Sequence, residues 1–175
     1  MINSHKELKI KIFADGANVV EMKKVYNEGL VKGFTTNPTL MKKDGVTDYV
    51  SFAKDVLNEI KDMPISFEVF SDDFGEMEKQ ARLIGSWGEN VYIKIPVTNT
   101  KSENSYELIR KLSSDGLKLN ITAILTVKQV EEVMEAVSDK TKSIISVFAG
   151  RIADTGRDPV PYMKQSAEIV KRNGN

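Results

Sequence analysis

A lysine at the centre of an apolar strand is the residue of this sequence that most clearly indicates catalytic chemistry. Lys94 lies in VYIKIPV, residues 91–97, where five of the seven residues are Val, Ile or Tyr. Such a run is typical of a strand buried on both faces. Burial of an ammonium group is unfavourable, so the lysine must reach solvent, pair with a carboxylate, or be held as a neutral amine. A neutral amine is the form that attacks a carbonyl to make a Schiff base.

The alternation of side chains along a strand predicts where Lys94 points. Residues of the same parity share a face, so Tyr92, Lys94 and Pro96 lie together, and we expect them on the inner face of the sheet. Two acids, Asp15 and Glu68, could pair with the lysine there. From the strand alone, an ion pair in the core or a lysine that extends to solvent explains this residue better than catalysis does.

Further polar residues lie near the ends of other predicted strands. Asp15 precedes a glycine, a pattern typical of a turn or a helix N-cap. The residue before a proline avoids the α region, so Asn37 should be extended, although an Asn-Pro pair by itself indicates only a turn. Glu68 lies between apolar residues in SFEVF, where a carboxylate needs a partner. Arg151 follows SVFAG, where it could bind an anion such as phosphate or cap a strand end.

Composition excludes several kinds of chemistry. The 175 residues include no Cys, and the one His, His5, lies in a polar N-terminal stretch, which argues against thiol nucleophiles, His- or Cys-ligated metals and a Ser-His-Asp triad. The 25 basic and 25 acidic residues cancel without any block of like charge, so neither nucleic acid nor a membrane surface is an expected partner. No apolar run is long enough to cross a membrane, and the first residues lack the apolar core of a signal peptide. We therefore expect a cytoplasmic protein whose partners are small molecules or other proteins.

Short apolar runs alternate with amphipathic stretches along the whole chain. Six strands are predicted, at residues 9–15, 32–37, 65–70, 91–97, 117–125 and 143–149. A helix should follow each strand, and apolar residues spaced i, i+3 and i+4 locate helices over 19–30, 47–60, 77–84 and 127–137, with the last over 162–175. Successive βα units give parallel strands with helices outside, so the fold class is α/β, in one domain over residues 1–175.

Polar residues at strand ends favour a (β/α)8 TIM barrel over an open, doubly wound sheet. The first βα junction, FADGANVV, contains no glycine-rich phosphate motif. A barrel brings many strand ends to one point, and the six predicted strands carry polar residues at or near their carboxyl ends, namely Asp15, Asn37, Glu68, Lys94, Asn120, Thr122 and Ser146. Because such a barrel has eight units, we expect only six to be present here, with two lacking at the C-terminus.

Six motifs, in this order and spacing, resemble the transaldolase family: FADGAN, GFTTNPTLM, SFEVF, VYIKIPVT, LNITAIL and ISVFAGRIAD. The resemblance runs from around Ile10 to the end of the chain, and TTNPT and IKIPVT are its most characteristic segments. It implies a Schiff-base aldol transferase on a (β/α)8 barrel, which acts on sugar phosphates without a metal or cofactor. Family members form dimers to decamers, so a homo-oligomer is also compatible with the resemblance.

The resemblance implies a role for each matching residue. Lys94 would form the imine with the substrate ketone, and Asp15 would take the proton from the hydroxyl whose carbon leaves as an aldehyde. Glu68 and Thr122 would hold a water that transfers protons while the imine forms and is hydrolysed. Asn37, Asn120 and Ser146 would bind the dihydroxyacetone hydroxyls, and Thr35 would support these residues. Arg151 would bind the substrate phosphate, and Phe148 is also implied to line the substrate site.

Two positions bear on the reaction within the family. Relatives that act as fructose-6-phosphate aldolases tend to carry an amide at Glu68 and a tyrosine at Phe148, so this chain matches the transferase pattern. The expected reaction, a step of the pentose phosphate pathway, converts sedoheptulose 7-phosphate and glyceraldehyde 3-phosphate to erythrose 4-phosphate and fructose 6-phosphate. Fructose-6-phosphate aldolase is the first alternative. A catalytically silent, shortened barrel is the second, because the family's seventh strand, with a serine and a basic residue for the phosphate, has no counterpart here.

Overall fold

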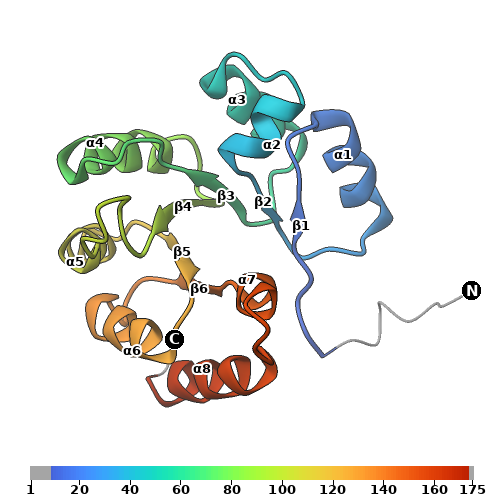
Figure 1. Ribbon diagram of the computed structural model, residues 1–175. Coiled ribbons are helices and arrows are strands. Elements are labelled where there is room, and N and C mark those ends of the chain that lie inside the picture. The colour runs from blue at the N-terminus through green and yellow to red at the C-terminus, as the bar shows by residue number, and fades with distance from the viewer. Residues whose placement is uncertain (1–8, 174–175) are drawn as a thin grey trace, which may run out of the picture. The chain divides into compact units, whose positions relative to one another are not determined.

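The computed structural model describes residues 9–173, so His5 with the rest of 1–8, and residues 174–175, lie outside the described residues. Parallel strands alternate with helices through this part of the chain, which confirms the α/β class (Figure 1). Two compact units are present. The first unit holds the residues up to Glu68 with Ser86–Val91, and the second unit holds Val69–Gly85 with the residues from Tyr92 onward. The single domain expected from sequence stays a prediction. No helix in residues 9–173 is long and apolar enough to span a membrane.

The first unit contains three parallel strands in chain order. Its elements are β1 (Ala14–Asp15), α1 (Val19–Glu28), β2 (Phe34–Thr35), α2 (Pro38–Lys43), α3 (Tyr49–Glu59) and β3 (Ile65–Glu68). Phe34 lies opposite Ala14 on one side and Ile65 on the other. β1 is much shorter than the predicted strand over residues 9–15, because residues 9–11 are exposed. Before β1, the Ile12 carbonyl still accepts a hydrogen bond from the Lys32 amide, which lies just before β2.

Side-chain caps fix where the helices of the first unit begin. Asn18 accepts a hydrogen bond from the Glu21 amide at 3.1 Å and caps α1. Asn37 and Asp48 cap α2 and α3 in the same way, through the amides three residues later. Each cap satisfies an N–H that has no partner within its helix. Asp15 is therefore not an N-cap, and its carboxylate is available for other hydrogen bonds.

The second unit also contains parallel strands in chain order. Its elements are α4 (Phe74–Gly85), β4 (Val91–Pro96, from Tyr92 onward), α5 (Tyr106–Ser114), β5 (Leu119–Ile124), α6 (Val127–Ala136), β6 (Ser143–Val147), α7 (Ala149–Asp154) and α8 (Val160–Arg172). α2, α5 and α7 were not located from sequence; α2 and α7 have only six residues each, too short for an apolar period to be visible.

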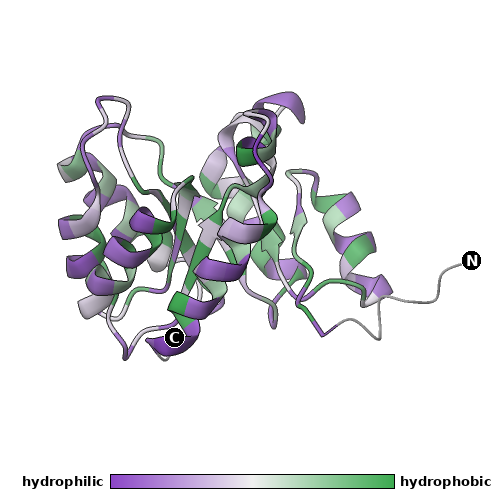
Figure 2. Ribbon diagram, turned by 60° about the horizontal axis from the view of Figure 1, so that its bottom comes forward, coloured by the Kyte–Doolittle hydropathy of each residue, from purple (hydrophilic) through white to green (hydrophobic). Residues whose placement is uncertain are grey.

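An aliphatic layer joins the strands of the second unit to its helices. The strands are mainly hydrophobic, whereas the helices carry hydrophobic residues on one side and hydrophilic residues on the other (Figure 2). The layer consists of side chains that are at most 1% exposed, namely Ile93, Ile95, Ile109, Leu112, Leu119, Ile121, Ile124, Val130 and Val133. Burial of this kind stabilises by about 25 cal/mol per Å² of apolar surface, so these residues fix the register of β4 and β5.

Gly33, directly before β2, gives a first test of the packing. A Cβ at this position would lie 2.3 Å from the Phe13 ring and 2.8 Å from the carbonyl oxygen of Pro64. Gly33→Ala should therefore lower the free energy of unfolding by about 1–3 kcal/mol, the usual range for overpacking. Urea denaturation measures this change. Gly16→Ala is the matched control, since its Cβ would make only an ordinary 3.5 Å contact with Met22, and an equal loss in both variants would contradict the packing described.

A network of ion pairs on the second unit should make the stability of the fold depend on pH. Glu78 of α4 binds Arg82 at 2.9 Å and Lys111 of α5 at 2.8 Å, and Arg82 also binds Asp115 at 2.7 Å. Hydrogen bonds from Lys111 and Arg82 hold the pKa of Glu78 below its ordinary value. A lowered pKa contributes stability above the unfolded value of about 4.3, and this contribution is lost as the pH falls through the folded value.

Glu78→Gln should therefore lower the urea midpoint at pH 7, and the difference from wild type should shrink and vanish as the pH falls below about 4. Glu107→Gln is the control, because Glu107 pairs with Arg110 of its own helix and is 89% exposed, so it should change little at any pH. A Glu78→Gln difference that is the same at every pH would rule out the network as its source.

Candidate active site

Three predicted site residues form one hydrogen-bonded cluster in the first unit. β1 and β2 pair with Asp15 opposite Thr35, and the Asp15 carboxylate accepts hydrogen bonds from Thr35 Oγ1 at 2.9 Å and Asn37 Nδ2 at 3.2 Å. Asn37 has extended backbone, as expected before a proline, and its other amide atom, Oδ1, caps α2. The carboxylate is exposed on one side and held by two donors on the other, which is suitable for a base at a fixed position.

Glu68 ends β3 in the same unit. It is half-buried, and the residues on either side of it, Phe67 and Val69, are buried. Its carbonyl oxygen accepts a hydrogen bond from the Tyr49 hydroxyl at 2.9 Å. The apolar spacing of residues 47–60 predicted a helix that includes Tyr49 but not this hydrogen bond, because a contact between residues 19 positions apart leaves no local pattern.

β4 alternates as predicted in the second unit. Val91, Ile93 and Ile95 are buried, and Tyr92, Lys94 and Pro96 are half-buried, so the lysine lies on the face opposite the aliphatic layer. Within the β4–β5 ladder, Lys94 lies opposite Asn120 and Pro96 lies opposite Thr122. Lys94 is thus placed on a strand face rather than on a flexible loop.

A second hydrogen-bonded cluster lies on β5 and β6. Ser146 Oγ donates to Asn120 Oδ1 at 2.7 Å, which links the strand next to Lys94 to the strand beyond it. Asn120 is 1% exposed and Thr122 is 2% exposed. A buried amide and a hydroxyl that bind each other provide both donors and acceptors, which is the chemistry needed to bind sugar hydroxyls.

The backbone of β5 is irregular beside Thr122. Ala123 has φ 60°, in the left-handed region, and the β5–β6 register shifts between Ile121 and Ile124. Such a bulge bends a strand and redirects its side chains. Within the described residues the buried Thr122 Oγ1 has no hydrogen-bond partner. A buried hydroxyl of this kind is unfavourable unless a water or a ligand satisfies it, so Thr122 stays a candidate residue of a binding site.

Substitution of Ala123 tests the left-handed backbone. Ala123→Val should destabilise the fold by about 1–2 kcal/mol, because a β-branched residue is strained at positive φ. Ala123→Asn, which adds a side chain at least as large, should cost less because asparagine tolerates this region. Thermal denaturation compares the two variants. If the valine variant were as stable as the asparagine variant, the positive φ at this position would be refuted.

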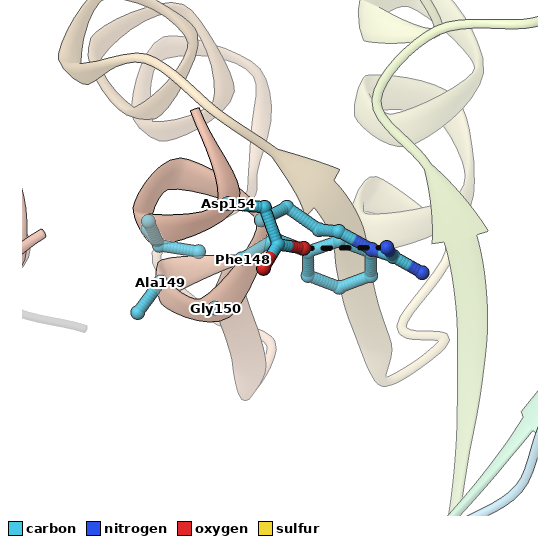
Figure 3. Close-up of a pocket in the computed structure, with 6 residues that line it drawn as sticks. Phe148, Ala149, Gly150 and Asp154 are labelled. Atoms are coloured by element: carbon cyan, nitrogen blue, oxygen red, sulfur yellow. Dashed lines mark hydrogen bonds and ion pairs between the residues drawn. The ribbon is translucent and has the colours of Figure 1, made fainter. Parts of the chain in front are cut away.

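Phe148 and Arg151 line an open pocket of about 500 Å³ at the end of β6, together with Val147, Ala149, Gly150 and Asp154 (Figure 3). Arg151 lies in α7, is 75% exposed, and contacts Asp154 through Nη1 at 3.4 Å, so it does not cap a strand end. A guanidinium in an open pocket can bind a phosphate. Asp154 was missed from sequence, although its position three residues after Arg151 is a spacing typical of helical ion pairs.

The predicted site residues are therefore divided between the two units. Asp15, Thr35, Asn37 and Glu68 belong to the first unit, and the second holds Lys94, Asn120, Thr122, Ser146, Phe148 and Arg151. That the two sets form one site stays a prediction. Among residues 9–173, no group of three or more His, Cys, Asp or Glu side chains could hold a metal ion.

Comparison with known proteins identifies the family. Residues 12–175 match the family model described as transaldolase/fructose-6-phosphate aldolase. The chain belongs to this family. A "Probable transaldolase" of Dehalococcoides mccartyi is 36% identical over 165 residues, which cover 94% of this chain and 73% of the relative. "Probable transaldolase 2" of Listeria monocytogenes is 35% identical, with 94% and 71% covered, and a "Probable transaldolase" of Streptococcus agalactiae is 37% identical, with 92% and 70% covered.

A solved structure shows the fold class. The crystal structure of dihydrodipicolinate synthase from Rhodopseudomonas palustris, a TIM barrel, matches with a TM-score of 0.55 at 14% identity. The match covers 85% of this chain and 62% of that protein, so the transaldolase-family chain spans about three fifths of its length. The predictions of the family and of a partial (β/α)8 fold are both confirmed.

Proposed function

We propose that this chain is a transaldolase-type transferase that moves a dihydroxyacetone unit between sugar phosphates through a Schiff base on Lys94. The observation that carries the proposal is the placement of Lys94 on β4 opposite Asn120, whose side chain is bound by Ser146. In a member of the transaldolase/fructose-6-phosphate aldolase family, this arrangement places an amine beside groups that can bind the hydroxyls of a ketose.

The proposed reaction begins when the Lys94 amine attacks the ketone carbon of sedoheptulose 7-phosphate. Water leaves, and the resulting imine withdraws electrons from the bond between its α and β carbons. Asp15 takes the hydroxyl proton of the departing carbon, the bond breaks, and erythrose 4-phosphate leaves as the aldehyde. The three-carbon enamine on Lys94 then attacks glyceraldehyde 3-phosphate, and hydrolysis of the new imine releases fructose 6-phosphate.

Each supporting residue has a proposed role that suits its surroundings. Asp15 receives two hydrogen bonds, which hold its carboxylate at a fixed position, as the role of a base requires. Thr122 carries a buried hydroxyl without a partner in the described residues, which suits a residue that holds a water together with Glu68. Arg151, in its open pocket, would bind the substrate phosphate. The absence of Cys suits the reducing cytoplasm in which the pentose phosphate pathway operates.

Fructose-6-phosphate aldolase is the second candidate from the same family. Glu68 and Phe148 favour the transferase, since the aldolase pattern has an amide and a tyrosine at these positions. The two activities differ in their product. The aldolase would release free dihydroxyacetone from fructose 6-phosphate without any acceptor aldehyde, whereas the transferase would retain the three-carbon unit on Lys94 until an acceptor arrives.

Borohydride reduction tests the Schiff base directly. Incubation with fructose 6-phosphate and borohydride should leave one reduced adduct, and peptide mass spectrometry should find it on the peptide that contains Lys94. Lys94→Met should abolish the adduct. Lys118→Met is the matched control, because Lys118 is also half-buried and lies directly before the neighbouring strand, and this variant should be labelled like wild type. A folded wild-type chain without an adduct would instead support a catalytically silent protein.

A further inference from the structure

The carbonyl oxygen of Glu68 is a hydrogen-bond acceptor to which the β2 side of the ladder offers no backbone amide. Along the β2–β3 ladder, the Phe34 amide donates to Pro64 at 2.9 Å and the Thr36 amide donates to Ser66 at 3.0 Å. The next amide in this series would belong to residue 38 and would donate to Glu68. Residue 38 is a proline, which has no N–H, so the ladder must end there.

The Tyr49 hydroxyl takes the place of the missing amide. It lies at the first residue of α3 and donates to the Glu68 carbonyl at 2.9 Å. The same sequence feature that ends β2, the Asn-Pro pair that begins α2, therefore removes the backbone amide that would continue the β2–β3 ladder to Glu68, and a side-chain hydroxyl donates there instead. Burial raises the pKa of the Tyr49 hydroxyl, so it remains protonated and able to donate throughout the physiological pH range.

Three aromatic rings hold the hydroxyl in place. The Tyr49 ring packs edge-on against Phe67 at 6.1 Å and Trp87 at 5.3 Å between ring centroids, and Phe67 and Trp87 are 5.5 Å apart. Phe67 precedes Glu68 on β3, so its side chain lies on the opposite face of the strand. The packed rings thus hold β3 in place on the face that carries Phe67. The Tyr49 hydroxyl fixes the peptide group of Glu68, from which the Glu68 side chain extends to the other face.

We propose that Tyr49 is a positioning residue, which acts through Glu68 in the proton transfers of imine formation and hydrolysis. This inference rests on the proposed function, in which Glu68 holds the water that carries protons to and from the Lys94 adduct. A displaced carboxylate would slow those steps without altering how the ketose binds. Tyr49 would touch neither the substrate nor the reacting atoms.

Tyr49→Phe is the test, because it removes the hydroxyl and retains the ring packing. We expect the rate of borohydride trapping at saturating fructose 6-phosphate to fall roughly ten-fold, less than the hundred-fold that a displacement of about 1 Å can cause. The ketose concentration that gives half this rate should change less than about two-fold, as it would for an effect confined to the chemical steps. Tyr26→Phe is the matched control, since it removes a tyrosine hydroxyl bound at 2.7 Å to Asp62 on the same unit, and its rate should equal that of wild type.

A double-mutant cycle separates positioning from a general structural effect. In a Glu68→Ala background, Tyr49→Phe should cause no further loss of rate, since its effect passes through the missing carboxylate. Equal losses in the two backgrounds, or an unchanged rate in the single variant, would overturn the assignment while leaving the proposed function intact. A folded wild-type chain that forms no adduct would overturn both.

Discussion

The register of the parallel strands is the constraint on which the candidate site depends. Side chains alternate along a strand, so a slip of one residue would exchange the two faces. On β4 such a slip would turn Lys94 toward the helices and both Ile93 and Ile95 toward the opposite face. The completely buried isoleucines and leucines of β4 and β5 prevent it, because their exposure would cost several kcal/mol (about 1.5–3 for each large side chain). Hydrophobic packing on one face thus determines the chemistry on the other.

Departures from regular structure occur where the two units carry their polar residues. Pro38 ends the β2–β3 ladder beside Asn37, and the Tyr49 hydroxyl donates to Glu68 in place of the amide that the proline lacks. On β5, the left-handed Ala123 interrupts the ladder next to Thr122, whose buried hydroxyl has no partner among residues 9–173. Irregular backbone and unsatisfied polar groups are unfavourable for stability, and they persist where they serve a site.

Much of this arrangement follows from local rules and could be predicted from the sequence. The parity of VYIKIPV predicted that Lys94 shares a face with Tyr92 and Pro96, and Pro38 predicted the extended backbone of Asn37. The repeated βα pattern gave the fold class. Contacts between distant residues could not be predicted in this way. The Tyr49 hydroxyl reaches Glu68 only because α3 packs beside β3, and the positive φ of Ala123 has no signal in a residue that is common in both helices and strands.

The crystal structure of the chain after reduction with borohydride in the presence of fructose 6-phosphate would test the central claim most directly. The account predicts continuous electron density from Lys94 Nζ to a three-carbon unit whose hydroxyls contact Asn120 and Ser146. Density on another lysine such as Lys118, or an unmodified Lys94 in a chain that binds the ketose elsewhere, would contradict it.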